Sequence, residues 1–579
     1  MAYNSQNPLI VQGDHTILVE VDSPRYEAAR DELARFAELI KSPEHVHTYR
    51  ITPLSIWNAC AAGIPADRIG TALQEYAKYD VPVHVLTEIH DFAGRYGRLK
   101  LHRDDDALRL DVTDAPLAEE IWRNQESRKH LESRDDALSF RILPLNRGKL
   151  KQALVKIGWP VQDLAGYVEG EALQVALRDV TLEGLPFALR PYQREAVSVF
   201  HAGGKATGGS GVITLPCGAG KTVIGLGAMA EISASTLILV TNTAAVRQWI
   251  REILDKTQLQ ADQVGEYTGQ TKNIRPVTVS TYQILTYRRS RGGDFVHMGL
   301  FDGRNWGLII YDEVHLLPAP VFQLTAEIQA RRRLGLTATL VREDGCEDDV
   351  FALIGPKKYD VPWKVMEGQG WIATAACREI RVSLPEPMRM EYAITEQRRK
   401  FRYASENPAK LPVLRRILDR HRDEQTLIIG TYVEHLRGIA DKLGVPVLTG
   451  QTSNAQREKH YEDFRAGRLR TLAVSKVANF AIDLPDAAVA IQISGTFGSR
   501  QEEAQRLGRL LRPKAGSNQA HFYTIVTRET IEQEFALKRQ LFLTEQGYAY
   551  DILDESDLNR RQIAGGGAVA STVAAGSPS

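Results

Sequence analysis

The sequence predicts an α/β protein in which two parallel-sheet domains follow one another and a smaller mixed α/β region precedes them. After Gly184, short apolar runs rich in β-branched residues alternate with helical stretches, as in sheets covered by helices on both faces. The alternation starts again after a stretch with Pro and Gly near residues 355–370. The chain has 579 residues, which gives room for several domains of about 150 residues each.

The apolar runs define the strands expected in each sheet. The first domain, residues 181–367, is expected to have strands at 212–215, 236–240, 277–280 and 308–311. The second domain, residues 368–550, is expected to have strands at 426–429, 472–474, 489–493 and 522–526. Short apolar runs of this kind are typical of strands buried on both faces. We therefore expect two domains of similar architecture, each of about 180 residues.

The first 180 residues predict a smaller region in two parts. Residues 1–135 mix strand-like alternation with amphipathic stretches, and they include a strongly charged helix and connector over 113–136. A short strand at 140–143 followed by a helix at 148–157 indicates a small module over 136–180. Two small units are therefore expected before the first parallel sheet.

The C-terminal residues 551–579 predict a disordered tail. From Ile563 to Ser579 the sequence is rich in Gly, Ala and Ser and carries no charge. A segment of this composition cannot bury enough apolar surface to offset the entropy lost on ordering.

Charge is distributed unevenly along the chain. The 72 Lys and Arg balance the 72 Asp and Glu, which excludes a protein held to nucleic acid by a uniformly basic surface. Residues 1–150 carry 19 basic and 24 acidic side chains, a net charge of −5. Residues 371–550 carry 28 basic and 21 acidic side chains, a net charge of +7. A basic face is therefore expected on the second parallel-sheet domain.

The cysteines and the apolar segments indicate a cytoplasmic protein. No two of the cysteines lie within four residues of each other, which excludes a C-x-x-C zinc or iron–sulfur pattern; they are Cys60, Cys217, Cys346 and Cys377. We expect them to be thiols in a reducing compartment. No basic segment followed by an apolar stretch stands at the N-terminus, and no window approaches the ~20 apolar residues of a membrane span.

A glycine-rich loop after the first apolar run predicts a phosphate-binding site. The loop lies between a strand and a helix opening at Val223 and consists of Leu215, Pro216, Cys217, Gly218, Ala219, Gly220, Lys221 and Thr222. Its glycines permit a tight backbone path whose N–H groups point at phosphate oxygens. Lys221 can reach the β- and γ-phosphates, and Thr222 can ligate Mg²⁺. Leu215 stands where the strict P-loop pattern has its first glycine, so a chance glycine-rich turn is the alternative for the loop alone.

Two carboxylates at the end of a later strand complete the expected nucleotide site. The run 308–311 ends in Asp312 and Glu313. Asp312 can hold Mg²⁺ through water, while Glu313 can orient the water that attacks the γ-phosphate. A strand-end acidic pair alone is usually a solvated turn, and the P-loop favours the catalytic interpretation. His315 follows and can link this site to the segment 336–339.

A basic helical segment in the second domain predicts arginine fingers. Gln505, Arg509 and Arg512 are spaced to share one face of a helix. A planar guanidinium is well suited to stabilise the charge that develops during phosphoryl transfer. The alternative is a solvated basic face, which the P-loop makes the weaker interpretation.

In sequence order, these motifs resemble those of the superfamily 2 helicases, and among them the XPB-type DNA repair helicases. Asp312-Glu313-Val314-His315 is similar to the DEVH form of motif II, and Arg342-Glu343-Asp344 is similar to the Arg-Glu-Asp signature of XPB. Further similar segments are 189–193 (the adenine-reading Q-motif analogue), 241–249 (motif Ia), 280–283 (motif Ic), 474–485 (motif V) and 505–512 (motif VI).

The resemblance implies two RecA-like motor domains and further site residues. It implies adenine recognition by Gln193 with Arg190, and nucleotide contacts by Asp483 and Gln505. DNA contacts are implied for Thr243, Arg247, Thr281, Arg342, Glu343 and Asp344. It also implies that 1–135 is an XPB-type N-terminal domain and 136–180 a damage-recognition-like module. The basic and aromatic segment 388–411 is the candidate for a thumb-like element, with a solvated amphipathic helix as the alternative.

The function implied is an ATP- and Mg²⁺-dependent 3′–5′ DNA helicase or translocase of DNA repair, in a compact bacterial form. Single-stranded DNA and forks or duplexes are the expected partners, and a monomer is the default. A nuclease or repair protein is a further partner class. Two alternatives remain open: a motor subunit of a nuclease complex, which would need a nuclease partner, and an ATP-gated DNA-binding protein or duplex translocase without strand separation.

Overall fold

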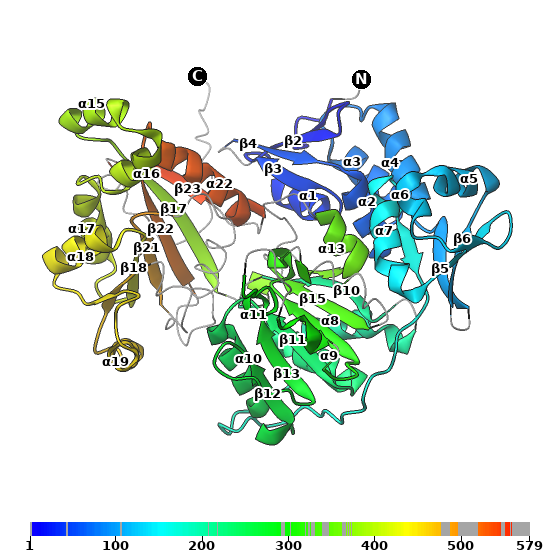
Figure 1. Ribbon diagram of the computed structural model, residues 1–579. Coiled ribbons are helices and arrows are strands. Elements are labelled where there is room, and N and C mark those ends of the chain that lie inside the picture. Colours follow the sequence, from blue (N-terminus) through cyan, green and yellow to red (C-terminus); the bar gives the residue numbers. More distant parts are fainter. Residues whose placement is uncertain are drawn as a thin grey trace.

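The computed structural model describes most of the chain and confirms the predicted fold class. The described residues are 3–41, 45–104, 107–205, 208–216, 218–290, 296–301, 303–318, 320–321, 325, 331–338, 347–361, 366–367, 369, 371, 373–475, 487–495, 519–545, 550–555 and 557. Two seven-stranded sheets lie in separate parts of the molecule, and every strand pairing within each of them is parallel (Figure 1).

The first parallel sheet has the strand order β12-β13-β11-β14-β15-β10-β16. Its strands are β10 (Ser210–Thr214), β11 (Thr236–Val240), β12 (Val264–Tyr267), β13 (Val277–Thr281), β14 (Leu308–Asp312), β15 (Arg332–Thr337) and β16 (Lys357–Asp360). Its helices are α8 (Pro191–His201), α9 (Lys221–Ile232), α10 (Thr243–Lys256), α11 (Tyr282–Leu285) and α13 (Glu347–Leu353), with short 3₁₀ turns at 202–204, 261–263, 298–301 and 314–316. The four strands expected from the apolar runs are all present.

Both faces of this sheet are buried, which explains why its strands are continuous apolar runs. On β11, Ile238 and Val240 pack on the face that α8, α9 and α10 cover. The alternate residues, Leu237 and Leu239, pack on the opposite face with residues of α11 and α13. The described helices include none long and apolar enough to span a bilayer.

The second parallel sheet has the order β19-β20-β18-β21-β22-β17-β23. Its strands are β17 (Thr374–Val382), β18 (Thr426–Gly430), β19 (Val447–Leu448), β20 (Thr471–Ser475), β21 (Val489–Gln492), β22 (Gln519–Thr527) and β23 (Tyr550–Asp554). Its helices are α15 (Glu386–Ile394), α16 (Gln397–Ser405), α17 (Lys410–Arg420), α18 (Val433–Leu443), α19 (Asn454–Arg465) and α22 (Ile531–Glu545). The segment 388–411 thus covers most of α15, all of α16 and the start of α17.

The N-terminal region contains two further sheets. The first has four antiparallel strands in the order β1-β2-β4-β3, and its strands are β1 (Leu9–Val11), β2 (Thr16–Glu20), β3 (Glu38–Lys41) and β4 (Val46–Arg50). It packs with α1 (Tyr26–Leu33), α2 (Pro53–Ala61), α3 (Ala66–Tyr76) and α4 (Val83–Arg95) around one apolar core.

The second of these sheets has five strands in the order β7-β8-β6-β5-β9, and it spans residue 135, where the sequence predicted a domain boundary. Its elements are β5 (Leu99–Asp104), β6 (Ala107–Val112), α5 (Ala115–Arg123), α6 (Gln125–Arg128), β7 (Ser133–Arg134), β8 (Ser139–Ile142), α7 (Arg147–Lys156) and β9 (Val161–Asp163), with a 3₁₀ turn at 144–146. One core extends from Leu99 to Ala165. Because β5 pairs with both β6 and β9, these strands belong to one unit. The boundary between the two N-terminal cores therefore lies between α4 and β5.

The N-terminal region docks on the first parallel-sheet domain through α13 and β16 (Figure 1). Gln152 Nε2 donates to Asp349 Oδ1 at 2.7 Å, and the backbone N–H of Lys357 donates to Asn58 Oδ1 at 2.9 Å. The rings of Trp57 and Phe351 pack with their centroids 6.3 Å apart. The N-terminal region thus packs against α13 and the edge strand β16, on the side of the sheet opposite α9 and α10.

Candidate nucleotide-binding site

The predicted phosphate loop connects β10 to α9. Gly218 and Gly220 have φ angles of +82° and +76°, a conformation that residues with a Cβ rarely adopt. A Cβ on Gly220 would also lie 2.6 Å from Gln193 Nε2. The helix begins at Lys221, with Thr222 half-buried in its first turn. The backbone N–H groups of this first turn have no partner within the helix, which is the arrangement that binds phosphate.

Lys221 and Glu313 face each other across the site. The Lys221 Nζ lies 3.7 Å from Glu313 Oε1 and 3.5 Å from the carbonyl oxygen of Leu215. Their side chains are 11% and 17% exposed, so solvent still reaches both. Glu313 has a φ of +51°, an unusual conformation for a residue with a side chain, which points to local strain at this position. The structure therefore brings the phosphate loop and the end of β14 together, as the sequence predicted.

Asp312 is held from two sides by hydrogen bonds. Its Oδ2 accepts from the Trp249 indole Nε1 at 2.8 Å, and its Oδ1 accepts from the backbone N–H of Glu313 at 3.1 Å. Burial, with the neighbouring Glu313 carboxylate, raises the pKa of Asp312 to about 6, although Trp249 and Lys221 oppose the change. Two carboxylates, Asp312 and Glu313, thus lie beside Lys221 at the end of β14.

His315 links this strand end to the next strand, as the sequence predicted. Its Nδ1 lies 2.7 Å from the Thr337 hydroxyl, at the end of β15, and 3.6 Å from Glu313 Oε2. The end of β14 is therefore connected to the end of β15 through His315.

Gln193 and Arg190 line the other side of the phosphate loop. Gln193 accepts from the backbone N–H of Arg190 and donates to the carbonyl oxygen of Ala219 at 3.2 Å, while the Tyr192 hydroxyl donates to the same oxygen at 2.7 Å. The Arg190 guanidinium lies 4.8 Å from the centre of the Trp371 ring. The amide of Gln193 thus holds the loop in shape, and Trp371 provides a flat surface beside it.

Three of the residues predicted to contact DNA, Thr243, Arg247 and Thr281, lie at or just after the carboxyl ends of neighbouring strands of this sheet. Thr243 and Arg247 are exposed in the first turns of α10, which follows β11. Thr281 ends β13, is 4% exposed, and accepts from the backbone N–H of Ile284, so it caps α11. β13 and β11 lie on one side of β14, and β10 lies on the other. These motifs therefore share the carboxyl ends of the parallel strands, with the predicted DNA contacts after β13 and β11 and the nucleotide motifs after β14 and β10.

Several predicted residues lie outside the described part of the chain. They are Cys217, Arg342, Glu343, Asp344, Asp483, Gln505, Arg509 and Arg512. Conversely, sequence reasoning missed two side chains that bond to Asp312: Trp249, and Tyr282, whose hydroxyl donates to the Asp312 carbonyl oxygen at 2.9 Å. Gly225, inside α9, was a signal of close packing at Trp249, because glycine is unfavourable within a helix.

Two tandem parallel sheets of one strand order, with a phosphate loop and a strand-end Asp-Glu pair on the first, define a RecA-like motor ATPase of the superfamily 2 helicase type. Comparison with known proteins specifies the family. Family models match as follows: "ERCC3/RAD25/XPB C-terminal helicase" over residues 366–564, "Type III restriction enzyme, res subunit" over 186–342 and "Helicase conserved C-terminal domain" over 9–135.

Relatives match over nearly the whole chain. The DNA 3′-5′ helicase XPB of Mycobacterium tuberculosis is 54% identical, with 96% of this chain and 99% of that protein covered. The DNA 3′-5′ helicase XPB of Kineococcus radiotolerans is 53% identical, with 96% and 98% covered. The helicase/translocase subunit XPB/SSL2 of Saccharomyces cerevisiae is 31% identical, with 95% and 72% covered. The chain belongs to the XPB family of DNA helicases.

Proposed function

We propose that this protein is an ATP-dependent 3′–5′ DNA helicase that couples ATP hydrolysis between its two RecA-like domains to movement along DNA. The observation that carries the proposal is the approach of Lys221 to Glu313, which joins the phosphate loop and the strand-end carboxylates in one site. The identity to relatives named DNA 3′-5′ helicase XPB supports the direction of movement and the substrate.

The donor set fits Mg²⁺. Asp312 and the hydroxyl of Thr222 offer hard oxygen ligands of the kind that Mg²⁺ prefers. Burial and the neighbouring Glu313 carboxylate raise the pKa of Asp312, and a divalent ion would offset both effects. When bound, Mg²⁺ neutralises part of the triphosphate charge.

The chain's own residues have distinct roles in this proposal. Lys221 leaves Glu313 to contact the β- and γ-phosphates, and the N–H groups from Gly218 to Thr222 cradle the phosphate oxygens. Glu313 is then free to accept a hydrogen bond from the attacking water and to orient it. Gln193, with Arg190, recognises the adenine.

The second RecA-like domain contributes to the same reaction. We propose that Arg509 and Arg512 act as arginine fingers, that Gln505 lies beside the γ-phosphate, and that Asp483 contacts the nucleotide. Closure of the two domains then completes the site, and hydrolysis opens it.

DNA contacts alternate with this cycle. Thr243, Arg247 and Thr281 are proposed to contact one strand from the first domain, together with Arg342, Glu343 and Asp344. Contacts to phosphates give little sequence preference and a strong dependence on salt. The thumb-like element 388–411 is proposed to contact DNA from the second domain.

The biological setting is DNA repair in a bacterial cytoplasm, with the protein acting as a monomer. The match to XPB models and to bacterial relatives supports this setting. Residues 136–180 are proposed to belong to a damage-recognition module, and a nuclease or repair protein is the expected partner class.

The substitution Lys221→Ala tests the site. We expect it to abolish ATP hydrolysis and strand displacement on a 3′-tailed duplex, while DNA binding stays within a few-fold of the unmodified protein. Lys205→Ala, an exposed lysine just before the first parallel sheet, is a matched control that should change neither activity. Retained ATP hydrolysis in Lys221→Ala would contradict the assignment.

Duplex translocation without strand separation is the second candidate function. Several eukaryotic relatives are named helicase/translocase, and the model matching 186–342 is named for a restriction-enzyme subunit. Strand displacement on a 3′-tailed duplex supports the helicase. Displacement of a triplex strand, without separation of the duplex, supports the translocase.

A further inference from the structure

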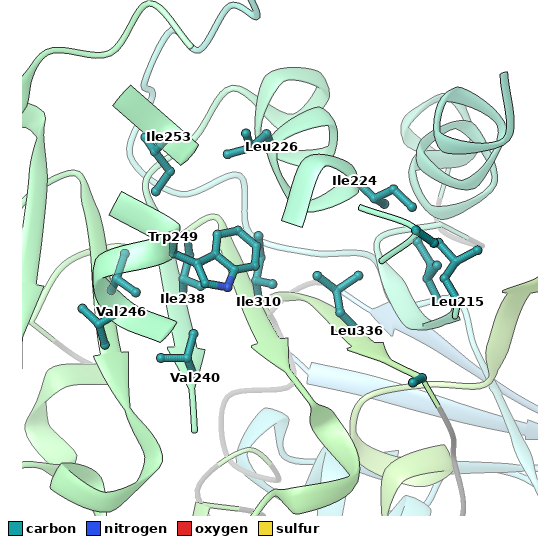
Figure 2. Close-up of a cluster of buried hydrophobic side chains, with 14 of the residues drawn as sticks. Leu215, Ile224, Leu226, Ile238, Val240, Val246, Trp249, Ile253, Ile310 and Leu336 are labelled. Carbon is teal, nitrogen blue, oxygen red and sulfur yellow. The ribbon is translucent and has the colours of Figure 1, made fainter. Parts of the chain in front are cut away.

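Trp249 is a buried side chain that the proposed mechanism does not yet use. It lies on the inner face of α10 between Val246 and Ile253, and it is 1% exposed. Figure 2 shows its indole among Ile238, Val246 and Ile310, in the core shared by α9, α10 and the sheet. α10 is also the helix that carries the exposed Thr243 and Arg247, the proposed DNA contacts.

Among the buried tryptophans of the described residues, Trp249 differs from Trp306 and Trp57 in its hydrogen-bond partner. A buried indole N–H needs an acceptor, because leaving it unpaired is costly. Trp306 and Trp57 donate theirs to the backbone carbonyl oxygens of Leu300 and Phe92. Trp249 instead donates to the side chain of Asp312, at 2.8 Å. Hydrogen bonds to a carboxylate are short and strong, so this one restrains the orientation of that carboxylate.

The helix of the phosphate loop fixes the position of the indole from the other side. Gly225 lies one turn after Lys221 in α9, and a Cβ there would come within 2.5 Å of the Trp249 ring. Glycine within a helix is less favourable than alanine, so its presence agrees with a need for this close approach. The indole is thus held between α9 and the end of β14.

A second element of the proposed DNA face also contacts Asp312. Tyr282 begins α11 directly after Thr281, and its hydroxyl donates to the Asp312 carbonyl oxygen at 2.9 Å. The two segments expected to touch DNA, α10 and the β13–α11 junction, therefore each place one hydrogen bond on the same residue.

We propose that Trp249 is a positioning residue that transmits DNA engagement by α10 to Asp312, and thereby couples DNA binding to the binding of the metal–nucleotide complex. A small displacement of α10 moves the indole, and the hydrogen bond carries that displacement to the carboxylate. This inference rests on the proposed function, because it takes α10 as a DNA contact and Asp312 as a Mg²⁺ ligand.

Thermodynamic linkage makes the proposal measurable without turnover. If DNA changes the affinity for Mn²⁺·ADP by some factor, Mn²⁺·ADP must change the affinity for DNA by the same factor. Mn²⁺ binding in the presence of ADP is followed by electron paramagnetic resonance, with and without a 3′-tailed duplex. The ratio of the two Mn²⁺ dissociation constants is the coupling factor.

The test variant is Trp249→Phe, which retains an aromatic ring but removes the N–H. We expect its Mn²⁺ dissociation constant to rise about 10-fold, as for loss of a residue that orients a metal ligand. Its coupling factor should fall toward 1. The matched control is Trp306→Phe, which removes a buried indole N–H from the same domain at a backbone acceptor; both quantities should stay within two-fold.

An unchanged coupling factor in Trp249→Phe would overturn the proposal, even if the protein is less stable. If that variant does not fold, Gly225→Ala replaces it, because the added Cβ displaces the ring while leaving its N–H. It should lower the coupling factor, and an unchanged value again overturns the proposal. Failure of the proposed function is distinguishable, since the unmodified protein would then show no DNA-stimulated ATP hydrolysis.

Discussion

The two RecA-like domains share one topology but differ at the ends of their strands. Numbered by order within each domain, both sheets read 3-4-2-5-6-1-7. After the first strand, β10 leads into the phosphate loop with Gly218, Gly220 and Lys221, whereas β17 leads into Ser383, Leu384 and Pro385. After the fifth strand, β14 leads into Glu313, whereas β21 leads into Ile493. The topology thus provides matching positions in the two domains, and the proposed phosphate-binding residues stand at these positions in the first domain and not in the second.

A Lys–Glu pair in each domain shows what this difference means physically. Lys221 and Glu313 are 3.7 Å apart and partly exposed, so nucleotide can separate them. Lys410 and Glu532 are 2.7 Å apart, and both are almost fully buried. Lys410 also donates to the carbonyl oxygen of Ile493, just after β21, and Glu532 accepts from the backbone N–H of Thr527. Lys221 and Glu313 can therefore change partners during a reaction, whereas Lys410 and Glu532 remain paired with each other in the core.

The largest expected effect is on catalysis in the first domain. Glu313→Gln retains the shape of the side chain but cannot take a proton from the attacking water. We expect DNA-stimulated ATP hydrolysis to fall by about 10²–10⁴-fold, with nucleotide and DNA binding preserved. Steady-state hydrolysis of ATP in the presence of a 3′-tailed duplex measures it. Glu532→Gln is the matched substitution in the second domain. If ATP hydrolysis per folded molecule fell as far in Glu532→Gln as in Glu313→Gln, the proposed distinction between the two Lys–Glu pairs would be wrong.

The next effect is on the stability of the second domain. Lys410→Met leaves the Glu532 carboxylate buried without its cation, which we expect to lower the free energy of unfolding by about 3–5 kcal/mol. Urea denaturation followed by circular dichroism measures the loss. Adding Glu532→Leu should recover part of it, because the unpaired buried charge is then removed. A loss below ~1 kcal/mol in Lys410→Met would show that the Lys410–Glu532 pair does not have the expected structural role in the second domain.

The sequence predicted four strands of each parallel sheet and the approach of the phosphate loop to the strand-end carboxylates, because these depend on local patterns. Continuous apolar runs marked β11, β14 and β18, and the glycines of the phosphate loop follow from its backbone conformation. The edge strands β12, β16, β19 and β23 were not predicted, and neither were the interior strands β15 and β17. The edge strands are short or carry polar residues, and β15 and β17 carry arginines among their apolar residues, so the apolar pattern is weak in each of them.

Features that depend on distant pairing could not be predicted from local patterns. β5 pairs with β9, at Leu99 and Val161, and this contact joins residues on both sides of the predicted boundary at 135. Trp249 lies on an apolar stripe with Val246 and Ile253, which alone indicates a core residue. Its bond to Asp312 becomes visible only when β14 and α10 are placed together in space.

The smallest expected effect is a pH dependence that belongs to the second sheet. None of the described strands of the first sheet contains a histidine, whereas β22 contains His521. Its ring lies 4.8 Å from that of His421, and its Nδ1 lies 3.4 Å from Arg378 Nη1. Burial, followed by the nearby cationic groups His421, Arg378 and Arg420, lowers the pKa of His521 from 6.5 to about 4, against the pull of Glu424.

Because the folded-state pKa is lowered, the unfolded chain takes up this proton between pH 6.5 and 4 while the folded protein does not. The contribution of His521 to stability is therefore complete above pH 6.5 and decreases as the pH falls toward 4. Partial exposure of the ring reduces the effect to an expected ~1–2 kcal/mol. Urea denaturation at pH 7.5 and pH 5 measures it, and His521→Asn should show a smaller difference between the two pH values than the unmodified protein. If the change in stability between the two pH values were the same in both proteins, His521 would not be a source of acid sensitivity in the second sheet.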